Sequence, residues 1–411
     1  MPDRRHRDVA VVVGVCAIVL ALGAAGKACR GFWHDRLSFL CHSDIRALYS
    51  LRGMDRNLFP YLHGELIVST KVGPPVRFGL RPVDGANEYP VLTGILMWLP
   101  SLVSDRSDTY LLASVVLLAP FGLATACLLG RLTGRRALWW SASPILFLYA
   151  FHNWDLAVVA ASVAGFWCWW RGRPVFAAVC FGVGGALKLY PLLFLLPLVL
   201  EQIHEGDRRG AVHAGAAGAG MFTLINLPFM VLSPSGWAVA YRFQALRKPN
   251  YDSLWGILGT SLELDQGTIT TLSTLVVIVV LAVVTWETER RARREGAYPF
   301  LPACAALLAG FLLVSKVHSP QFALWMVPLF VLVRVRLGWY GLFVAGNVLL
   351  YLAIFAVSVW SIHARDVLVA WSVWGRTATF LLLVIAFLRA PPAVSHVLDP
   401  SQIVHAPTSA D

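Results

Sequence analysis

The sequence has few charged residues for its length. Only 14% of its 411 residues are Asp, Glu, Lys or Arg, whereas 57% are hydrophobic and 12% are aromatic. Soluble globular domains carry about 25% charged residues. This shortage of charge excludes an ordinary soluble domain. It predicts an all-α polytopic membrane protein with about 11 to 13 transmembrane or half-membrane helices.

Several chemical signatures are also absent. The chain has no Walker A loop, no GxGxxG after a strand and no HExxH motif, which argues against nucleotide-driven pumping and metalloprotease chemistry. Its seven cysteines form no CxxC pair, and no histidine spacing completes a zinc site. We therefore expect neither a metal nor a cofactor. Cys29 and Cys41 flank a polar loop and could form a disulfide on an oxidising side, although their spacing leaves this open.

Positive charge is concentrated in short runs between apolar segments. The net charge is +11, and arginines gather in "RRHR", "RLTGRR", "RGR", "RRARR" and "RVR". Such runs mark cytoplasmic loops, so they indicate topology and give no reason to expect a nucleic-acid partner. The first apolar run, 9–26, is interpreted as a retained first helix. Both termini are then expected on the cytoplasmic side of the plasma membrane.

The basic runs constrain which segments cross. Keeping 131–136 and 171–173 cytoplasmic requires that 91–103, a short segment with Pro100, does not cross. Residues 1–390 are then one membrane-embedded domain, and 391–411 are a disordered cytoplasmic tail. The polar segments expected on the outer side are 27–108, 152–155, 233–266, 315–321 and 361–366.

The stretch "GGALKLYPLLFLLPLVL", 184–200, places Lys188 and Pro191 in an apolar run. Because "RGR" before it and "EQIHEGDRRG" after it are both expected in the cytoplasm, the segment should enter the membrane and return as two half-helices. One long helix kinked at Pro191 is the alternative. A charge at this depth is costly, so we expect Lys188 to face an anion in a protein-lined cavity.

Candidate chemistry lies on the expected outer side. Asp44, shortly after the first span, is placed to act as a base on an acceptor hydroxyl. Glu88, where the first outer loop re-enters the membrane, is the second carboxylate considered. A solvated charge or a helix cap is the alternative for either residue, and for Asp35 and Asp84 in the same loop.

Polar residues at other outer helix ends complete the candidate site. Lys316, His318 and Gln321 occupy one turn and suit a phosphate-bearing ligand. Asn153 and Asp155 occupy another, where Asp155 could simply cap its helix. In 233–266, basic residues alternate with aromatics, which suits an anionic head group, sugar stacking or membrane-surface anchoring. The donor- and acceptor-binding candidates are Lys188, His318, Lys316, Gln321, Glu88, Asn153, Asp155, Tyr190, Arg242 and Arg376.

Six short segments of the sequence, taken together, resemble those of a known protein family. The sequences "CHSDIRALY", "NEYPVLTG", "HNWDLAVVA", "GALKLYPLLFLLPL", "PNYDSLW" and "KVHSPQFALW" follow one another in this order. The chain thereby resembles GT-C membrane glycosyltransferases of the family 87 type, seen in actinobacteria. The resemblance implies an extracytoplasmic active site, with Asp44 as base and with His318 and Lys188 in the site. The chain reads "SDI", without the two adjacent acids of some GT-C enzymes.

The resemblance also implies a reaction. A polyprenyl-phosphate sugar, usually mannose, would be the donor, a glycolipid or glycan hydroxyl the acceptor, and membrane lipids the surroundings. Basic side chains would hold the phosphodiester, and a single displacement would invert the anomeric centre without a metal. A secondary transporter or lipid flippase is the alternative, because broken helices and buried charges also occur there. The long first outer loop and the lack of a two-halves repeat favour the enzyme.

Overall fold

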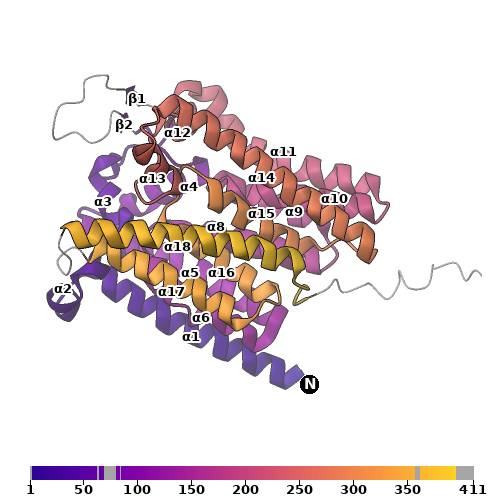
Figure 1. The fold of residues 1–411 in the computed structure, drawn as a ribbon. Coiled ribbons are helices and arrows are strands. Elements are labelled where there is room, and N and C mark those ends of the chain that lie inside the picture. Colours follow the sequence, from indigo (N-terminus) through magenta and orange to yellow (C-terminus); the bar gives the residue numbers. More distant parts are fainter. Residues whose placement is uncertain (1, 63, 69–79, 84, 357–361, 395–411) are drawn as a thin grey trace, which may run out of the picture.

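The computed structural model describes residues 2–62, 64–68, 80–83, 85–356 and 362–394 (Figure 1). Apolar segments of a membrane chain form helices because backbone N–H and C=O groups find no water there and must pair within the segment. Within the described residues, six helical stretches are long and apolar enough to span a bilayer, and six shorter apolar helices accompany them. The predicted all-α polytopic membrane fold is confirmed.

The described residues form eighteen α-helices, six short 3₁₀-helices and one pair of strands. The α-helices are α1 (Pro2–Ala28), α2 (Phe32–Arg36), α3 (Asp44–Leu51), α4 (Val91–Trp98), α5 (Ser107–Thr133), α6 (Leu138–Ser141), α7 (Pro144–Tyr149), α8 (Asp155–Trp170), α9 (Pro174–Leu187), α10 (Leu195–His204), α11 (Arg208–Leu232), α12 (Pro234–Leu246), α13 (Leu254–Ser261), α14 (Gln266–Glu295), α15 (Phe300–Val314), α16 (Ala323–Leu332), α17 (Leu337–Phe355) and α18 (Ile362–Arg389). The 3₁₀-helices are η1 (Ser38–Cys41), η2 (Met54–Arg56), η3 (Leu99–Val103), η4 (Gly134–Ala137), η5 (Tyr190–Phe194) and η6 (Pro320–Phe322), and the strands are β1 (Glu65–Val68) and β2 (Leu80–Val83).

The two strands form an antiparallel hairpin within the long first polar loop. Glu65 pairs with Val83 and Val68 with Leu80, and the hairpin contacts α12. The sequence analysis did not predict this hairpin. The predicted loop residue Asp84 and the predicted tail segment 395–411 lie outside the described residues.

The predicted basic loops lie at one end of the molecule, which we call the basic end. Arg5 donates to the carbonyl of Arg131 at 2.6 Å, and Arg135 forms an ion pair with Asp8 at 2.7 Å. Arg171 lines the same cavity as Arg5 and Arg131. Helix α5 ends here, and the residue that follows it, Gly134, has a φ of +61°. The chain turns back at this glycine, and α6 and α7 then pack along α1.

The two remaining basic runs join the basic end through backbone contacts. Arg136 donates to the carbonyls of Phe330, Val331 and Val333 at 2.8 to 2.9 Å. Arg291 donates to the carbonyls of Leu388 and Ala390 at 2.9 and 3.0 Å. The structure therefore gathers all five arginine runs, as the charge pattern predicted. In Figure 1 this end lies to the right, with the N-terminus.

The segment around Lys188 is a helical hairpin. The chain reverses between the end of α9 at Leu187 and the start of η5, and the rings of Phe181 and Phe194 lie 5.5 Å apart across the hairpin. A Cβ on Gly184 would lie only 2.9 Å from Pro191, so glycine permits the close approach. Trp169 donates to Glu201 at 2.6 Å, which brings α10 back to the basic end. The predicted half-helix pair is confirmed, and the single kinked helix is wrong.

The opposite end, which we call the site end, collects the five polar segments predicted to share one side. A backbone hydrogen bond joins the first loop to 152–155. Backbone and side-chain hydrogen bonds join the loop 233–266 to 315–321. Gln244 of that loop also donates to the carbonyl of Glu88 in the first loop. Arg365 interacts with Tyr251 and so adds the start of α18. In Figure 1 this end lies to the left, with α2, α3 and the hairpin.

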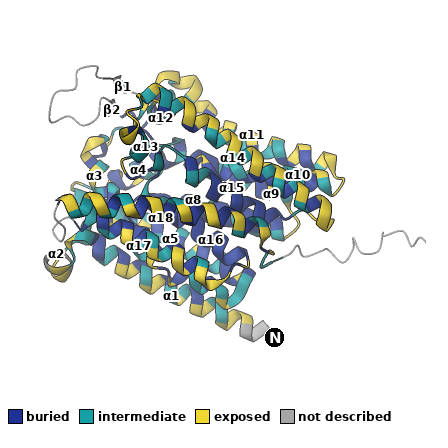
Figure 2. Ribbon diagram, viewed as in Figure 1, coloured by how far each residue is buried: buried dark blue, intermediate teal, exposed yellow. Residues whose placement is uncertain are grey.

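Burial separates an inner from an outer set of helices. Figure 2 shows α8, α15 and α16 largely buried, whereas α1, α11, α14 and α18 carry exposed faces. Only 11% of the most apolar window of α11 and 17% of that of α14 are buried. In a membrane protein such apolar outer faces contact lipid. The inner helices end at the site end, so they position its polar residues.

Candidate active site

Asp44 is held in place by its backbone neighbours. A disulfide between Cys29 and Cys41, whose Cα atoms lie 4.9 Å apart, closes the start of the first loop. The Asp44 N–H donates to the carbonyl of His152 at 2.8 Å, and the Ser43 hydroxyl donates to the carbonyl of Phe151 at 2.8 Å. The loop start is therefore docked on the turn between α7 and α8. Asp44 is the first residue of α3, where the helix dipole favours a negative charge.

The Asp44 carboxylate has one amide and two imidazole neighbours. Asn153 donates from Nδ2 to Oδ2 at 3.0 Å, His42 Nε2 lies 3.6 Å from Oδ1, and His152 Nε2 lies 3.8 Å from Oδ2. Burial raises the pKa of Asp44, but His152, His42 and Asn153 more than offset this and hold the pKa below its usual range. The side chain is 28% exposed. Asp44 is thus an ionised carboxylate that a hydroxyl can reach.

The two histidines beside Asp44 differ in exposure. The His152 side chain is 3% exposed, and burial lowers its pKa to about 3, so the imidazole is neutral at neutral pH. The His42 side chain is 47% exposed, and its ring stacks on Phe355 with centroids 4.7 Å apart. The sequence analysis singled out neither residue. The quoted pieces "CHSDIRALY" and "HNWDLAVVA" contain both histidines, but sequence spacing does not show that they meet.

Lys188 faces a carboxylate of the protein itself. Its Nζ lies 2.6 Å from Asp155 Oδ1 and 3.3 Å from Asn153 Oδ1. The Lys188 side chain is 9% exposed and Asp155 is fully buried. Trp325 also donates to Asp155 Oδ1, at 2.7 Å. Lys188 therefore has an anionic neighbour in Asp155, and its predicted contact with a donor phosphate stays a prediction.

Asn153 connects Lys188 to Asp44. Its amide oxygen accepts from Lys188, while its NH₂ group donates to Asp44 and, at 2.7 Å, to the hydroxyl of Tyr89. The Lys188 ammonium also lies 5.5 Å from the ring centres of Tyr89 and Trp325. The structure therefore brings together the predicted residues Asp44, Asn153, Asp155 and Lys188.

Tyr190 and Glu88 border this group through other contacts. The Tyr190 ring stacks on Trp325 with centroids 4.3 Å apart, and its hydroxyl pairs with Ser162 at 3.1 Å. Glu88 forms a two-point ion pair with Arg52 at 2.5 and 2.7 Å, and both side chains are about one-tenth exposed. Both oxygens of Glu88 are thereby occupied by Arg52, so they are less accessible to a substrate hydroxyl. Asp44 is therefore the better candidate of the two.

His318 and Arg376 belong to a second buried cluster. His318 Nδ1 lies 3.0 Å from the carbonyl of Leu312, and burial lowers the pKa of His318 well below its usual value. The ring centroids of Phe322 and His318 lie 5.9 Å apart. Lys188 Nζ lies 5.7 Å from the centroid of the same Phe322 ring. Arg376 donates to the carbonyl of Asp252. The second cluster thus adjoins the Asp44 group across one aromatic ring.

Within the part of the chain that the structure describes, three other predicted residues form no hydrogen bond or ion pair with the Asp44 group. Lys316 donates to the carbonyl of Ala245 at 2.8 Å and to the Thr270 hydroxyl at 2.9 Å, which ties its turn to α14. The Gln321 side chain accepts from the hydroxyl of Ser319. Arg242 is exposed on α12. We assign these residues no part in holding Asp44 or Lys188.

Arg247 lies at the end of α12, five positions after Arg242. It donates to Asn250 at 2.8 Å and to Gln244 at 3.4 Å. Burial lowers its pKa, while Tyr89, Glu88, Asp252 and Asp44 act in the opposite direction, so it lies within electrostatic reach of these groups. The sequence analysis noted a mixed basic and aromatic loop here. It could not choose between arginines five positions apart without knowing where α12 ends.

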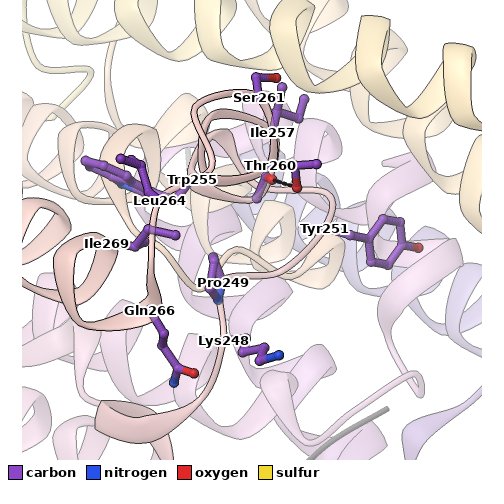
Figure 3. Close-up of a pocket in the computed structure, with 12 residues that line it drawn as sticks. Lys248, Pro249, Tyr251, Trp255, Ile257, Thr260, Ser261, Leu264, Gln266 and Ile269 are labelled. Atoms are coloured by element: carbon purple, nitrogen blue, oxygen red, sulfur yellow. Dashed lines mark hydrogen bonds between the residues drawn. The ribbon is translucent and has the colours of Figure 1, made fainter. Parts of the chain in front are cut away.

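A cavity lies at Lys248, the residue after Arg247, and Asp44 does not line it. It has a volume of about 710 Å³ and is bounded by the turn at Lys248, by α13 and by the start of α14. Figure 3 shows Lys248, Pro249 and Gln266 along one side and Trp255, Leu264 and Ile269 along another. We call this cavity the groove. Its size falls within the range of small-molecule sites.

One group at the site has the chemistry of metal ligands. Among the described residues, ligand atoms of His42, Asp44 and His152 lie within 4.8 Å of one another. Two imidazoles and a carboxylate suit several divalent ions. Asn153 and the two histidines also satisfy the carboxylate as it stands, so the geometry does not require an ion.

Fold and site together define a polytopic membrane protein with an ionised, reachable aspartate among buried polar side chains. Residues 88–315, more than half of the chain, match the sequence family described as glycosyltransferase family 87. The chain belongs to this family and is a membrane glycosyltransferase. The matched region contains Asn153, Asp155, Lys188 and Arg247, whereas Asp44 precedes it and His318 follows it.

Proposed function

We propose that this glycosyltransferase moves a sugar, with mannose the first expectation, from a polyprenyl-phosphate donor to a hydroxyl of a glycolipid or glycan. The site end would face the extracytoplasmic side of the plasma membrane and both termini the cytoplasm. Five arginine runs at the basic end support this orientation. The disulfide at the site end supports it independently, because disulfides persist in oxidising compartments.

The observation that carries the proposal is the state of Asp44. It is an ionised carboxylate, 28% exposed, hydrogen-bonded on one oxygen by Asn153 and joined to no lysine or arginine within the described residues. Such a group can accept a proton from a hydroxyl held against it. Glu88 and Asp155 are each paired with a cation.

The reaction follows from this assignment. The acceptor hydroxyl loses its proton to Asp44 as its oxygen attacks the anomeric carbon. The bond from that carbon to the phosphate oxygen breaks, and polyprenyl phosphate leaves with the electron pair. A single displacement of this kind inverts the anomeric centre, so a β-linked donor gives an α-glycoside. Cationic side chains at the site would stabilise the departing phosphate.

The proposal is tested with purified protein in lipid nanodiscs, radiolabelled polyprenyl-phosphate mannose and a lipid extract containing candidate acceptors. We expect a labelled glycolipid from the native protein and none from Asp44→Asn. Asp366→Asn, an exposed carboxylate at the start of α18, serves as the matched control and should retain transfer. Full transfer by Asp44→Asn would refute the base assignment, and lack of transfer from this donor by the native protein would refute the donor.

A further inference from the structure

Most cations at the site end already have partners. Lys188 is paired with Asp155 and Arg52 with Glu88. Lys316 is bound to Thr270 and to a backbone carbonyl, and Arg376 donates to the carbonyl of Asp252. A donor phosphate would have to displace an existing contact to bind any of them.

Lys316 and Arg376 hydrogen-bond only to neutral groups among the described residues. Arg247 shares this feature and, unlike Lys188 and Arg52, is not paired with a carboxylate there. Its guanidinium donates only to the neutral side-chain oxygens of Asn250 and Gln244, and within the described residues it forms no ion pair. Burial disfavours a cation without a counter-ion. A phosphate could take two hydrogen bonds from the planar guanidinium and restore the balance of charge.

The backbone at Arg247 connects the site to the groove. Residue 247 follows α12 with φ −67° and ψ 146°, an extended conformation. These angles are those of polyproline II, a conformation with three residues per turn in which neighbouring side chains point in different directions. Arg247 donates to Gln244, whose side chain donates to the carbonyl of Glu88 at 3.2 Å, while Lys248 lines the groove.

The groove has one polar end and an apolar body. Among the described residues that line it, Lys248 alone is charged, and Gln266 beside it donates to the carbonyl of Leu246. The rest of the lining is mainly apolar or aromatic, as Figure 3 shows for Trp255, Leu264 and Ile269. An occupant therefore needs a negative charge at one end and a hydrocarbon chain.

The groove continues into a lipid-facing surface. Beyond Ile269, α14 exposes an apolar stripe that begins with Leu272 and Leu275, which are 40% and 54% exposed. Helical spacing extends this stripe along one face. Its further members are Val279, Val283 and Trp286. Because α14 is a candidate membrane span, a chain lying in the groove can pass directly into the bilayer.

We propose that the phosphate of a polyprenyl-linked sugar binds between Arg247 and Lys248, with the first isoprene units in the groove and the sugar on the Asp44 side. This inference rests on the proposed function and adds a specific place for the donor. The segment Arg247–Asn250 would then separate the lipid part of the donor from the reacting part.

Binding of undecaprenyl phosphate, which has no sugar to transfer, tests the inference without relying on activity. Native protein in nanodiscs is titrated with this lipid and analysed by native mass spectrometry. Arg247→Gln removes the guanidinium, and Thr260→Trp fills the groove from an exposed lining position. Arg247→Gln should weaken binding about 10- to 100-fold, the range expected when a hydrogen bond to a charged group is lost. Thr260→Trp should also weaken binding, because the indole occupies the space of the lipid chain. Arg247→Lys should retain part of the affinity.

Matched controls lie on α14 outside the groove. Arg294→Gln changes an exposed arginine, and Thr271→Trp adds an exposed indole. Both should bind the lipid within about twofold of the native protein, the scale of surface substitutions, and inorganic phosphate should not compete. Equal binding by Arg247→Gln and Thr260→Trp, with unchanged thermal unfolding, would overturn the groove assignment alone. Absence of binding by the native protein would instead count against the donor in the proposed function.

Discussion

Asp44 and Asp155 are two aspartates near the side chain of Asn153, and they differ in solvent exposure and in their charged partners. Asn153 donates to Asp44 and shares Lys188 with Asp155. The Asp44 side chain is 28% exposed and has no lysine or arginine partner within the described residues. Asp155 is fully buried and paired with Lys188 at 2.6 Å.

This difference suits Asp44 to a catalytic role and Asp155 to a structural one. A base must be ionised and reachable by its substrate, and Asp44 meets both conditions. Asp155 in its buried ion pair is not reachable by a substrate, but the pair holds its members in one geometry and is costly to break. We therefore propose that Asp155 and Lys188 are positioning residues, which affect the reaction through their contact with Asn153.

The largest expected effect distinguishes the two aspartates by activity. Asp44→Asn should lower kcat by about 10² to 10⁴, the range for loss of a general base, while thermal unfolding stays near that of the native protein. Asp155→Asn should lower the unfolding temperature. The measurements are initial rates at saturating donor and thermal unfolding in detergent. A stable, inactive Asp155→Asn would reverse the proposed roles.

A double-mutant cycle on Lys188 and Asp155 should give the next largest effect. Lys188→Met leaves a buried carboxylate without its partner, and loss of one member of a buried pair costs about 3 to 5 kcal/mol. Lys188→Met with Asp155→Leu should recover much of that loss, because no charge remains buried. The free energy of unfolding from reversible denaturation in mixed micelles measures both. Additive losses would show that the two side chains do not interact.

Acid should reduce stability through His152. Its pKa is about 3 in the folded protein, against about 6.5 in an unfolded chain. Below pH 6.5 the unfolded state takes up a proton that the folded state does not, so stability falls as the pH drops and is constant above. From pH 6.5 to 5 the loss should be about 2 kcal/mol. His152→Gln should flatten this slope; His318, also buried, accounts for part of what remains.

Chelation should have the smallest effect. Asp44 is satisfied by Asn153 and two histidines, and the proposed mechanism draws its charge stabilisation from protein cations. Treatment with EDTA, followed by removal of the chelator, should leave the initial rate unchanged. A loss of activity that Mn²⁺ or Zn²⁺ restores would instead place an ion among His42, Asp44 and His152.

The sequence could predict which loops gather at the basic end and which at the site end, because this depends on the local composition of each loop. Arginine runs indicate which loops share a side, and parity then requires the chain to reverse near Lys188 and Pro191. The structure confirms both features. The β1–β2 hairpin was not predicted, because strand pairing between Glu65 and Val83 depends on residues far apart in the chain.

The partners within the site could not be predicted for a related reason. Lys188 and Asp155 are separated by 33 positions and meet only because α8 and α9 pack together. Similarly, Asp44 meets His152 across 108 positions through the docking of the loop on the turn after α7. The analysis of the sequence proposed Asp44, Asn153 and Lys188, which the structure brings together. The roles proposed for them, and for Arg242 on the exposed side of α12, stay predictions.

The disulfide also has a consequence for the order of events during synthesis. Cys29 and Cys41 are only 12 positions apart, so the ring can close soon after this part of the chain reaches an oxidising side. The turn at His152, on which Asp44 docks, is made more than one hundred residues later, about 5 to 20 seconds at ordinary rates of translation. The catalytic loop would therefore be shaped before its docking surface exists, and the later helices would assemble against a loop whose start is already fixed.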